Sequence, residues 1–288
     1  MKIIDIINTG KVTVSCELFP PKHGSELDAA KTIVQKTAAL NPSFISVTYK
    51  SGGETVDYTI SLAKEVLNAG NAASLAHLTC VASSHESVRR TLEEFRQAGI
   101  ENILALRGDI PDDNPFPTLS QYHYASELID EIRDYGGFCI GGACYPEGHP
   151  ESPTVQRDID NLKIKVDSGC QFLTTQMFFD NNVLYNFMFR LLKNDINVPI
   201  IAGIMPVTNA RQITRICKLS GTALPPRFKA IVDKFSDNQA AMSQAGVAYA
   251  TEQIIDLIAN GVNNIHIYTM NKPDIAGEIM NNLSEIFK

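Results

Sequence analysis

The strongest constraint on the fold is a regular alternation between short apolar runs and longer segments with helical periodicity. Several of the short runs are apolar at every position, which is typical of parallel strands covered on both faces. The 288-residue chain contains eight such runs. The predicted strands are residues 12–19, 44–49, 74–80, 102–106, 138–145, 172–178, 199–205 and 264–269.

The segments between these runs carry helix-end signals. In "SSHESVRRTLEEFRQAG", Ser83 and Glu86 have the spacing of a capping box, and Gly99 stands where a helix should end. "TNARQITRICKLSG" has the same organisation, with Thr208 or Asn209 as the expected cap. The stretch between residues 221 and 263 is long enough for an additional short helix before the last strand.

Strand followed by helix, eight times and without a break in composition, predicts an α/β fold, a (β/α)8 TIM barrel. One domain is expected to span residues 1–288. The competing architecture is a doubly wound open sheet. It is disfavoured because no G-x-G-x-x-G motif follows the first apolar run.

Composition excludes several classes of partner. The formal net charge of −7 argues against general affinity for nucleic acid. No apolar run approaches the roughly 18 residues of a membrane span, and residues 1–10 lack the apolar core of a signal peptide. The six cysteines form no C-x-x-C pair and lie mostly in apolar runs. We therefore expect reduced, buried cysteines, a cytoplasmic protein, and no metal centre.

Active sites of such barrels lie at the C-terminal ends of the strands. Glu17, in "VSCELFPPK", ends the first apolar run just before Pro20 and Pro21. An ionised carboxylate is costly to bury, so Glu17 is predicted to face a shared cavity, where a partly desolvated acid can keep a proton. The other polar candidates at strand ends are Thr48, Tyr49, His77, Thr79, Arg107, Gly108, Asp109, Tyr145, Glu147, His149, Gln176, Asn209, Gln212, Tyr268, Asn271 and Lys272.

Each candidate also has a purely structural interpretation. His77 could be a core histidine bonded to a carbonyl group, Arg107 and Asp109 could pair with each other, and Lys165 could be a solvated helix-end lysine. The convergence of so many polar groups at one end favours a binding site. Their mixture of carboxylates, amides, an arginine and tyrosines suits a polar heterocycle better than a metal ion or a nucleophilic serine.

Eight stretches carry a family resemblance, in the expected order from Cys16 to Lys272. They are "CELFPPK", "SVTYKSGG", "AHLTC", "LALRGDIP", "YPEGHPES", "LKIKVDSGCQFLTTQMFFD", "GIMPVTNARQ" and "HIYTMNK". Together they closely resemble the methylenetetrahydrofolate reductases, specifically the catalytic domain of the bacterial type.

The resemblance implies a barrel that binds FAD non-covalently. Hydride would pass from NAD(P)H, expected to be NADH, to FAD and then to 5,10-methylenetetrahydrofolate in a ping-pong reaction. The product, 5-methyltetrahydrofolate, supplies methyl groups for methionine synthesis. The implied partners are these small molecules and further copies of the chain in a homo-oligomer.

The resemblance also implies roles for individual residues. Glu17 matches the catalytic acid that helps to open the imidazolidine ring of the folate, and Asp109 matches a carboxylate near both flavin and pterin. The substrate-binding positions are Thr48, Asp109, Gln176, Gln212, Tyr268 and Lys272. The FAD-binding positions are Tyr49, His77, Arg107, Gly108, Asp109, Ala125, Tyr145, His149, Ser152, Asp158, Asn161, Ile164 and Lys165.

The spacing of three of these positions agrees with a shared site. Asp158, Asn161 and Lys165 are three and four residues apart, so they share one face of a predicted helix. Arg107 and Lys165 would then neutralise diphosphate charge.

Two positions depart from the family pattern. Ile216 stands where a phenylalanine is frequent, and Lys272 stands where an arginine is common. Two alternatives stay open at this stage: a pterin-binding barrel methyltransferase without flavin, and a non-catalytic subunit that binds folate or flavin.

Overall fold

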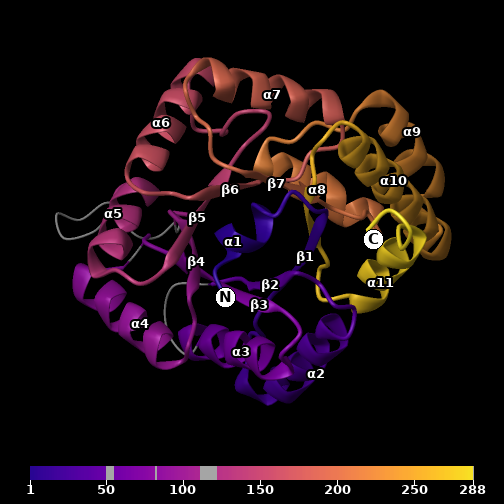
Figure 1. Ribbon diagram of the computed structural model, residues 1–288. Coiled ribbons are helices and arrows are strands. Elements are labelled where there is room, and N and C mark those ends of the chain that lie inside the picture. The colour runs from indigo at the N-terminus through magenta and orange to yellow at the C-terminus, as the bar shows by residue number, and fades with distance from the viewer. Residues whose placement is uncertain (50–54, 82, 111–121, 288) are drawn as a thin grey trace.

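The computed structural model describes residues 1–49, 55–81, 83–110 and 122–287. Within these residues, eight parallel strands form one closed barrel in chain order (Figure 1), and β8 pairs with β1. The predicted single-domain (β/α)8 barrel is confirmed. The strands are β1 (Thr13–Leu18), β2 (Phe44–Val47), β3 (Ala73–Thr79), β4 (Asn102–Leu106), β5 (Cys139–Cys144), β6 (Phe172–Thr175), β7 (Ile200–Ile204) and β8 (Asn264–Tyr268).

Except for the first, the helices of the described residues surround this barrel (Figure 1). They are α1 (Ile3–Ile7), the 3-10 turn η1 (Gly24–Glu26), α2 (Leu27–Ala38), α3 (Thr55–Ala69), α4 (His85–Gln97), α5 (Ala125–Tyr135), α6 (Val155–Asp167), α7 (Asn181–Lys193), α8 (Ala210–Ser220), α9 (Pro226–Phe235), α10 (Gln239–Ala259) and α11 (Pro273–Asn282). The additional helix predicted before the last strand is confirmed as α9. Residues 50–53 of "SVTYKSGG" and Pro111 of "LALRGDIP" lie outside the described residues.

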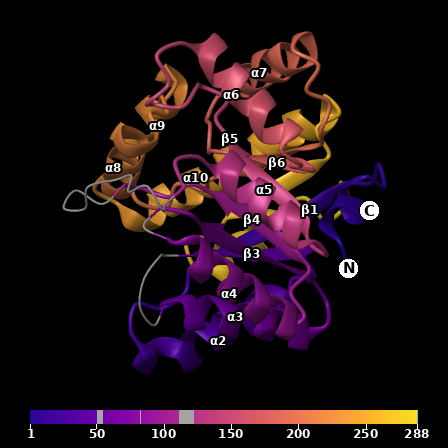
Figure 2. The same cartoon turned by 90° about the vertical axis from the view of Figure 1, so that its left-hand side faces the viewer.

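Two strands end two or more residues earlier than the apolar pattern predicts. β2 ends at Val47 rather than at residue 49, and β6 ends at Thr175 rather than at residue 178. The apolar pattern continues past β6 because Met177 and Phe179 leave the sheet and pack in a second core beneath α8, α9 and α10. In this layer α9 contacts both α8 and α10 (Figure 2).

One predicted helix cap is wrong. The N-cap of α4 is Ser84, whose Oγ accepts from the backbone N–H of Ser87, and Ser87 Oγ accepts from the Ser84 N–H in return. The sequence offers two adjacent serines, and the capping-box rule matched Ser83 because a glutamate follows it at the right spacing. Asn209 is confirmed as the cap of α8, where its Oδ1 accepts two backbone N–H groups.

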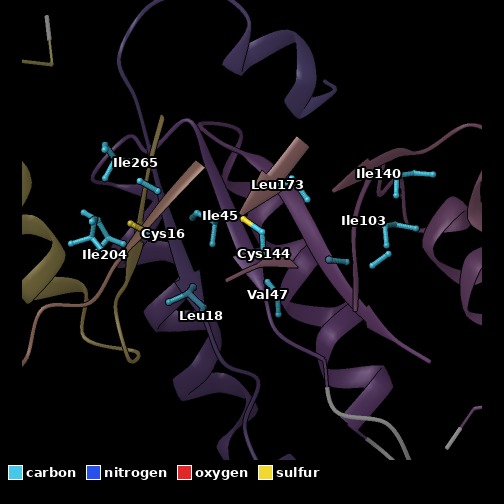
Figure 3. Close-up of a cluster of buried hydrophobic side chains, with 14 of the residues drawn as sticks. Cys16, Leu18, Ile45, Val47, Ile103, Ile140, Cys144, Leu173, Ile204 and Ile265 are labelled. Atoms are coloured by element: carbon cyan, nitrogen blue, oxygen red, sulfur yellow. The ribbon is translucent and has the colours of Figure 1, made fainter. Parts of the chain in front are cut away.

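Outward-facing side chains of the strands form the main core between barrel and helices. Figure 3 shows members of this core from several strands, among them Ile45, Ile103, Ile140 and Ile265. All six cysteines are buried and free, as expected from the sequence. Cys16 and Cys144 belong to this layer (Figure 3), and burial raises the pKa of the Cys16 thiol to about 12.

Helix α1 closes the N-terminal end of the barrel. Ile3 and Ile7 pack against inward-facing residues at the starts of the strands, including Phe44 and Phe172. Asn102 fastens the chain there: its Oδ1 accepts from the N–H of Ile3 at 2.8 Å, and its Nδ2 donates to the Met1 carbonyl at 3.1 Å. The functional end is therefore the opposite one, where the strands finish.

We expect Asn102→Ala to destabilise the fold by about 2 kcal/mol, because it leaves a buried N–H and buried carbonyl groups without partners. Urea denaturation followed by circular dichroism would measure the change. An Asn281→Ala variant, altered on the exposed surface of α11, should stay within about 0.5 kcal/mol of the parent protein. Equal stability of Asn102→Ala and Asn281→Ala would show that α1 is not fastened through this side chain.

Candidate active site

Glu17 lies inside the C-terminal end of the barrel. Its side chain comes from β1, which aligns Glu17 with Ser46 of β2 and Tyr268 of β8. Only 8% of the residue is exposed. Its Oε2 atom is 3.6 Å from His77 Nε2 and 3.9 Å from His266 Nε2. A carboxyl group and two imidazoles thus meet in the interior.

His77 is neutral at neutral pH. Burial lowers its pKa to about 4, against a smaller opposing effect of Glu17, and His266 adds to the lowering. Its Nε2 atom is buried and makes no hydrogen bond within the described residues. The imidazole therefore offers a polar atom to whatever lies beside Glu17, without carrying a charge there.

Tyr268 forms the wall next to this cluster. Its hydroxyl donates to the Thr175 carbonyl at 2.5 Å, and its ring meets that of His266 edge-on at 5.3 Å. Burial raises the pKa of Tyr268 well above the ordinary value, and the Glu17 carboxylate adds to this effect. Gly203 makes room for the ring, since a Cβ there would lie 2.6 Å from the tyrosine hydroxyl.

A second group of candidates gathers where β4 and β5 end. Arg107 donates to both carboxylate oxygens of Glu151, at 2.6 and 2.7 Å, rather than pairing with Asp109. The rings of Tyr145 and His149 meet edge-on at 4.6 Å. The pKa of Tyr145 is raised first by burial and then by the charge of Asp109, which places that exposed carboxylate near the phenol.

Helix α6 supports this second group. Asp158 accepts from the backbone N–H of His149 at 3.2 Å and from Ser152 Oγ at 2.9 Å, so it shapes the loop after β5. Lys165 reaches inward and donates to the Ala143 carbonyl at 2.6 Å. Burial lowers its pKa. The interpretation of Lys165 as a solvated helix-end lysine is therefore wrong.

Gly108 and Ala125 occupy crowded backbone positions. Gly108 has φ +86°, and a Cβ there would lie 2.7 Å from Val81 Cγ1, so only glycine fits without movement. Ala125 is the first residue of α5 and is 8% exposed.

The loops after other strands supply further candidates. Lys272 Nζ donates to Thr208 Oγ1 at 2.9 Å, which joins the loops that follow β7 and β8. Gln176 follows β6 directly, and its Oε1 accepts from the Met177 N–H at 2.9 Å. Thr48 follows β2 and is partly buried.

Four further candidates are exposed or lie beside another helix. Tyr49 is held near α4: burial raises the pKa of its phenol, and a hydrogen bond with Thr91 opposes this effect. Asn161 and Gln212 are exposed, and Ile164 is 53% exposed. Asn161 and Ile164 are exposed residues of α6. A ligand that contacts them must therefore extend from the barrel interior onto the surface of this helix.

Sequence reasoning missed residues that contact the chosen ones. His266, Ser15 and Ser46 surround Glu17 but were not singled out, although period-two alternation places His266 on the same face as Tyr268. Glu151, the partner of Arg107, lies within the quoted stretch "YPEGHPES". Its pairing follows from loop geometry that no periodicity encodes.

The described residues contain no cluster of three or more histidine, cysteine, aspartate or glutamate side chains placed to hold a metal ion. None of the described helices is both long and apolar enough to span a membrane.

The neutral state of His77 predicts a pH-dependent stability. Because the pKa falls from 6.5 to about 4 on folding, only the unfolded chain takes up this proton between those values. The free energy of unfolding should be unaffected by His77 above pH 6.5 and should fall, by up to about 3 kcal/mol, as the pH drops to 4. Urea denaturation at several pH values should give a flatter curve for His77→Asn. Identical slopes would contradict the neutral buried histidine.

Comparison with known proteins identifies the family. A family model described as methylenetetrahydrofolate reductase matches residues 2–284. The protein named 5,10-methylenetetrahydrofolate reductase from Escherichia coli (strain K12) is 31% identical over 274 residues, which is 95% of this chain and 91% of that one. Methylenetetrahydrofolate reductase (NADH) 1 from Arabidopsis thaliana is 32% identical over 99% of this chain, which spans 51% of the plant protein.

A solved structure shows the same fold. It is described as an uncharacterized protein from Clostridium thermocellum that binds two copies of 5-methyl-5,6,7,8-tetrahydrofolic acid. It superposes with a TM-score of 0.64 over 98% of both chains, at 16% sequence identity, so this likeness bears on the fold alone. The match of the family model over nearly the whole chain, together with the bacterial relatives, shows that the chain belongs to the methylenetetrahydrofolate reductase family of enzymes.

Proposed function

We propose that the protein reduces 5,10-methylenetetrahydrofolate to 5-methyltetrahydrofolate, with NADH as the hydride donor and non-covalent FAD as the carrier in a ping-pong reaction. Membership of the family supports the folate reaction. The plant relative whose name includes NADH supports that donor. The proposal extends to a homo-oligomer in the cytoplasm, where such folate chemistry would serve methionine synthesis.

The observation that carries the proposal is the buried acid Glu17 beside two imidazoles. Opening the imidazolidine ring of the substrate requires a proton on the departing ring nitrogen, and a positioned carboxylic acid supplies one. Glu17 lies at the end of the barrel where substrates of this fold bind.

The residues around β4, β5 and α6 fit FAD. Arg107 and Lys165 provide two cationic donors for diphosphate, from different elements of the fold. Gly108, at φ +86° and packed against Val81 and Thr79, fixes the course of the chain after Arg107. Tyr145 and His149 present apolar ring surface beside them.

In the proposed mechanism Arg107 and Lys165 would hold FAD, which would supply the hydride transfer from NADH to the folate. The protein binds, orients and protonates. Glu17 gives its proton to the ring nitrogen, so that the nitrogen–carbon bond breaks and leaves an electrophilic iminium on the folate. Asp109 is proposed to act through its charge on both the flavin and the pterin. Gln176, Gln212 and Lys272 are proposed to orient the folate through hydrogen bonds.

Anaerobic absorbance titration tests the proposal. The purified protein should be yellow, NADH should bleach the flavin, and methylenetetrahydrofolate should restore its absorbance. A colourless protein with no affinity for added FAD would favour the methyltransferase alternative. A flavin that NADH reduces but the folate does not reoxidise would favour a non-catalytic binding subunit.

Glu17→Gln should separate the two halves of the reaction. The amide keeps the size of the side chain but has no acidic proton, so flavin reduction by NADH should continue at its normal rate. Reoxidation by methylenetetrahydrofolate should slow by about 10²–10⁴-fold. Stopped-flow absorbance measures both steps in one preparation. Near-normal reoxidation in the variant would remove Glu17 from the acid role.

Lys165→Ala should weaken FAD binding by about 10–200-fold, because one charge-assisted bond to phosphate is lost. The variant should purify with little flavin and regain activity when FAD is added in excess. Lys163→Ala is the matched control: this lysine lies on the same helix but forms an exposed ion pair with Asp167 at 2.7 Å. If both variants kept their flavin through dialysis, α6 would not contact the cofactor.

A further inference from the structure

Glu147 joins two loops that lie far apart in the sequence. It follows β5 in the stretch "YPEGHPES", and neither the family resemblance nor the proposed mechanism gives it a role. Its Oε2 atom accepts from the backbone N–H of Ala223 at 3.0 Å, across 76 residues of chain. Ala223 lies in the connection between α8 and α9, residues 221–225. The half-buried side chain of Glu147 therefore ties the loop after β5 to the end of α8.

Two further contacts seat this connection. Gly221 ends α8 at φ +71°, and a Cβ there would lie 3.1 Å from Pro150 Cγ, so the turn rests against the loop after β5. Thr222, which is 7% exposed, donates from Oγ1 to the Met177 carbonyl at 3.2 Å, in the loop after β6. The C-terminal end of α8 is thus held by two strand-end loops, and Glu147 supplies the hydrogen bond to the first of them.

Glu147 also lies beside α8 itself. Burial raises the pKa of the Cys217 thiol on this helix to about 11, and the charge of Glu147 adds to the rise. The pKa of Glu147 is raised by burial as well; the hydrogen bond from Ala223 opposes this effect, and the charge of Asp180 adds to it. The position does not favour a charge, so a neutral oxygen acceptor of the same shape should serve the contact with Ala223 equally well.

The two segments that Glu147 joins carry different parts of the proposed site. The loop after β5 contains His149 and Ser152, which Asp158 holds on the FAD side. Helix α8 carries Gln212, which is proposed to orient the folate. Hydride transfer requires the two bound ligands to lie in the correct geometry, and a misplacement of about 1 Å slows such a step markedly. The distance between α8 and the loop after β5 therefore matters for the reaction with folate.

We propose that Glu147 is a positioning residue, which holds α8 where it binds the folate beside the flavin. The inference rests on the proposed function and deepens it, because it assigns the alignment of the folate-binding helix to one side chain. Without the bond to Ala223, α8 leaves this position for part of the time, and the folate has to restore it on binding. An equilibrium of this kind weakens the apparent affinity and leaves the rate at saturation unchanged.

Glu147→Ala tests the proposal through stopped-flow reoxidation of reduced flavin at increasing concentrations of methylenetetrahydrofolate. The half-saturating concentration should rise by about 3–10-fold, because one net hydrogen bond is lost, while the limiting rate stays within about twofold. Glu147→Gln should keep the parent values, because its amide oxygen still accepts from the Ala223 N–H. The FAD content of the purified protein should be the same in the parent and both variants.

Glu252→Ala is the matched control. Glu252 joins α10 to Arg227 of α9 in the same helical layer, but through an exposed ion pair, which contributes little to stability. Its half-saturating concentration should equal that of the parent protein. An unchanged half-saturating concentration in Glu147→Ala, or an equal rise in Glu147→Gln, would overturn the proposal.

Hydrogen exchange measured by mass spectrometry tests the position of α8 without any turnover. In the purified protein without folate, peptides from residues 210–224 should exchange faster in Glu147→Ala than in the parent protein or Glu147→Gln, and peptides from α2 should not change. Equal exchange of α8 in all three proteins would overturn the inference even if the folate reaction is confirmed. A parent protein with no folate-dependent reoxidation would refute the proposed function, and faster exchange in Glu147→Ala would still show that Glu147 holds α8.

Discussion

The closed register of the barrel is the constraint on which the site depends. Because strands alternate their side chains, the alignment of β1 with β8 places Ser15 beside His266 and Glu17 beside Tyr268 on the inner face. A shift of either strand by one residue would send Glu17 into the apolar layer between strands and helices. Pairing along all eight strands opposes such a shift, since no strand can slide without its neighbours.

The barrel interior is divided into an apolar end and a polar end. At the apolar end, α1 and the first inward residues of the strands form a closed cluster that includes Ile3, Phe44 and Phe172. Above it lie Ser15, Ser46 and His266, joined by hydrogen bonds. Glu17 and His77 lie beside them, and His77 Nε2 makes no hydrogen bond within the described residues. Close packing at the apolar end holds the strands rigidly. The side chains at the polar end therefore keep fixed separations of a few ångströms.

The sequence was sufficient to predict the barrel, its strand order and the strand that carries Glu17, because these follow from periodicity and from helix-end residues. The sequence was not sufficient where one local pattern is compatible with two different structures. Met177 and Phe179, which follow Thr175, have the apolar character of strand residues. They lie instead in a separate core, where they pack against α8, α9 and α10. The pairing of Arg107 with Glu151 joins two loops 44 residues apart, and no local pattern encodes it.

The two cationic candidates for the diphosphate differ in how firmly they are held. Glu151 is 57% exposed, so water screens its bidentate ion pair with Arg107, and a phosphate could compete with this carboxylate for the guanidinium. Lys165 is fixed differently, by a 2.6 Å bond to the Ala143 carbonyl and by packing over Gly142. The charge of Asp158 acts on Lys165, but its ammonium donates to the neutral Ala143 carbonyl, so a phosphate could approach Lys165 without displacing it. Arg107 would then be the adaptable contact for FAD, and Lys165 the one set by folding.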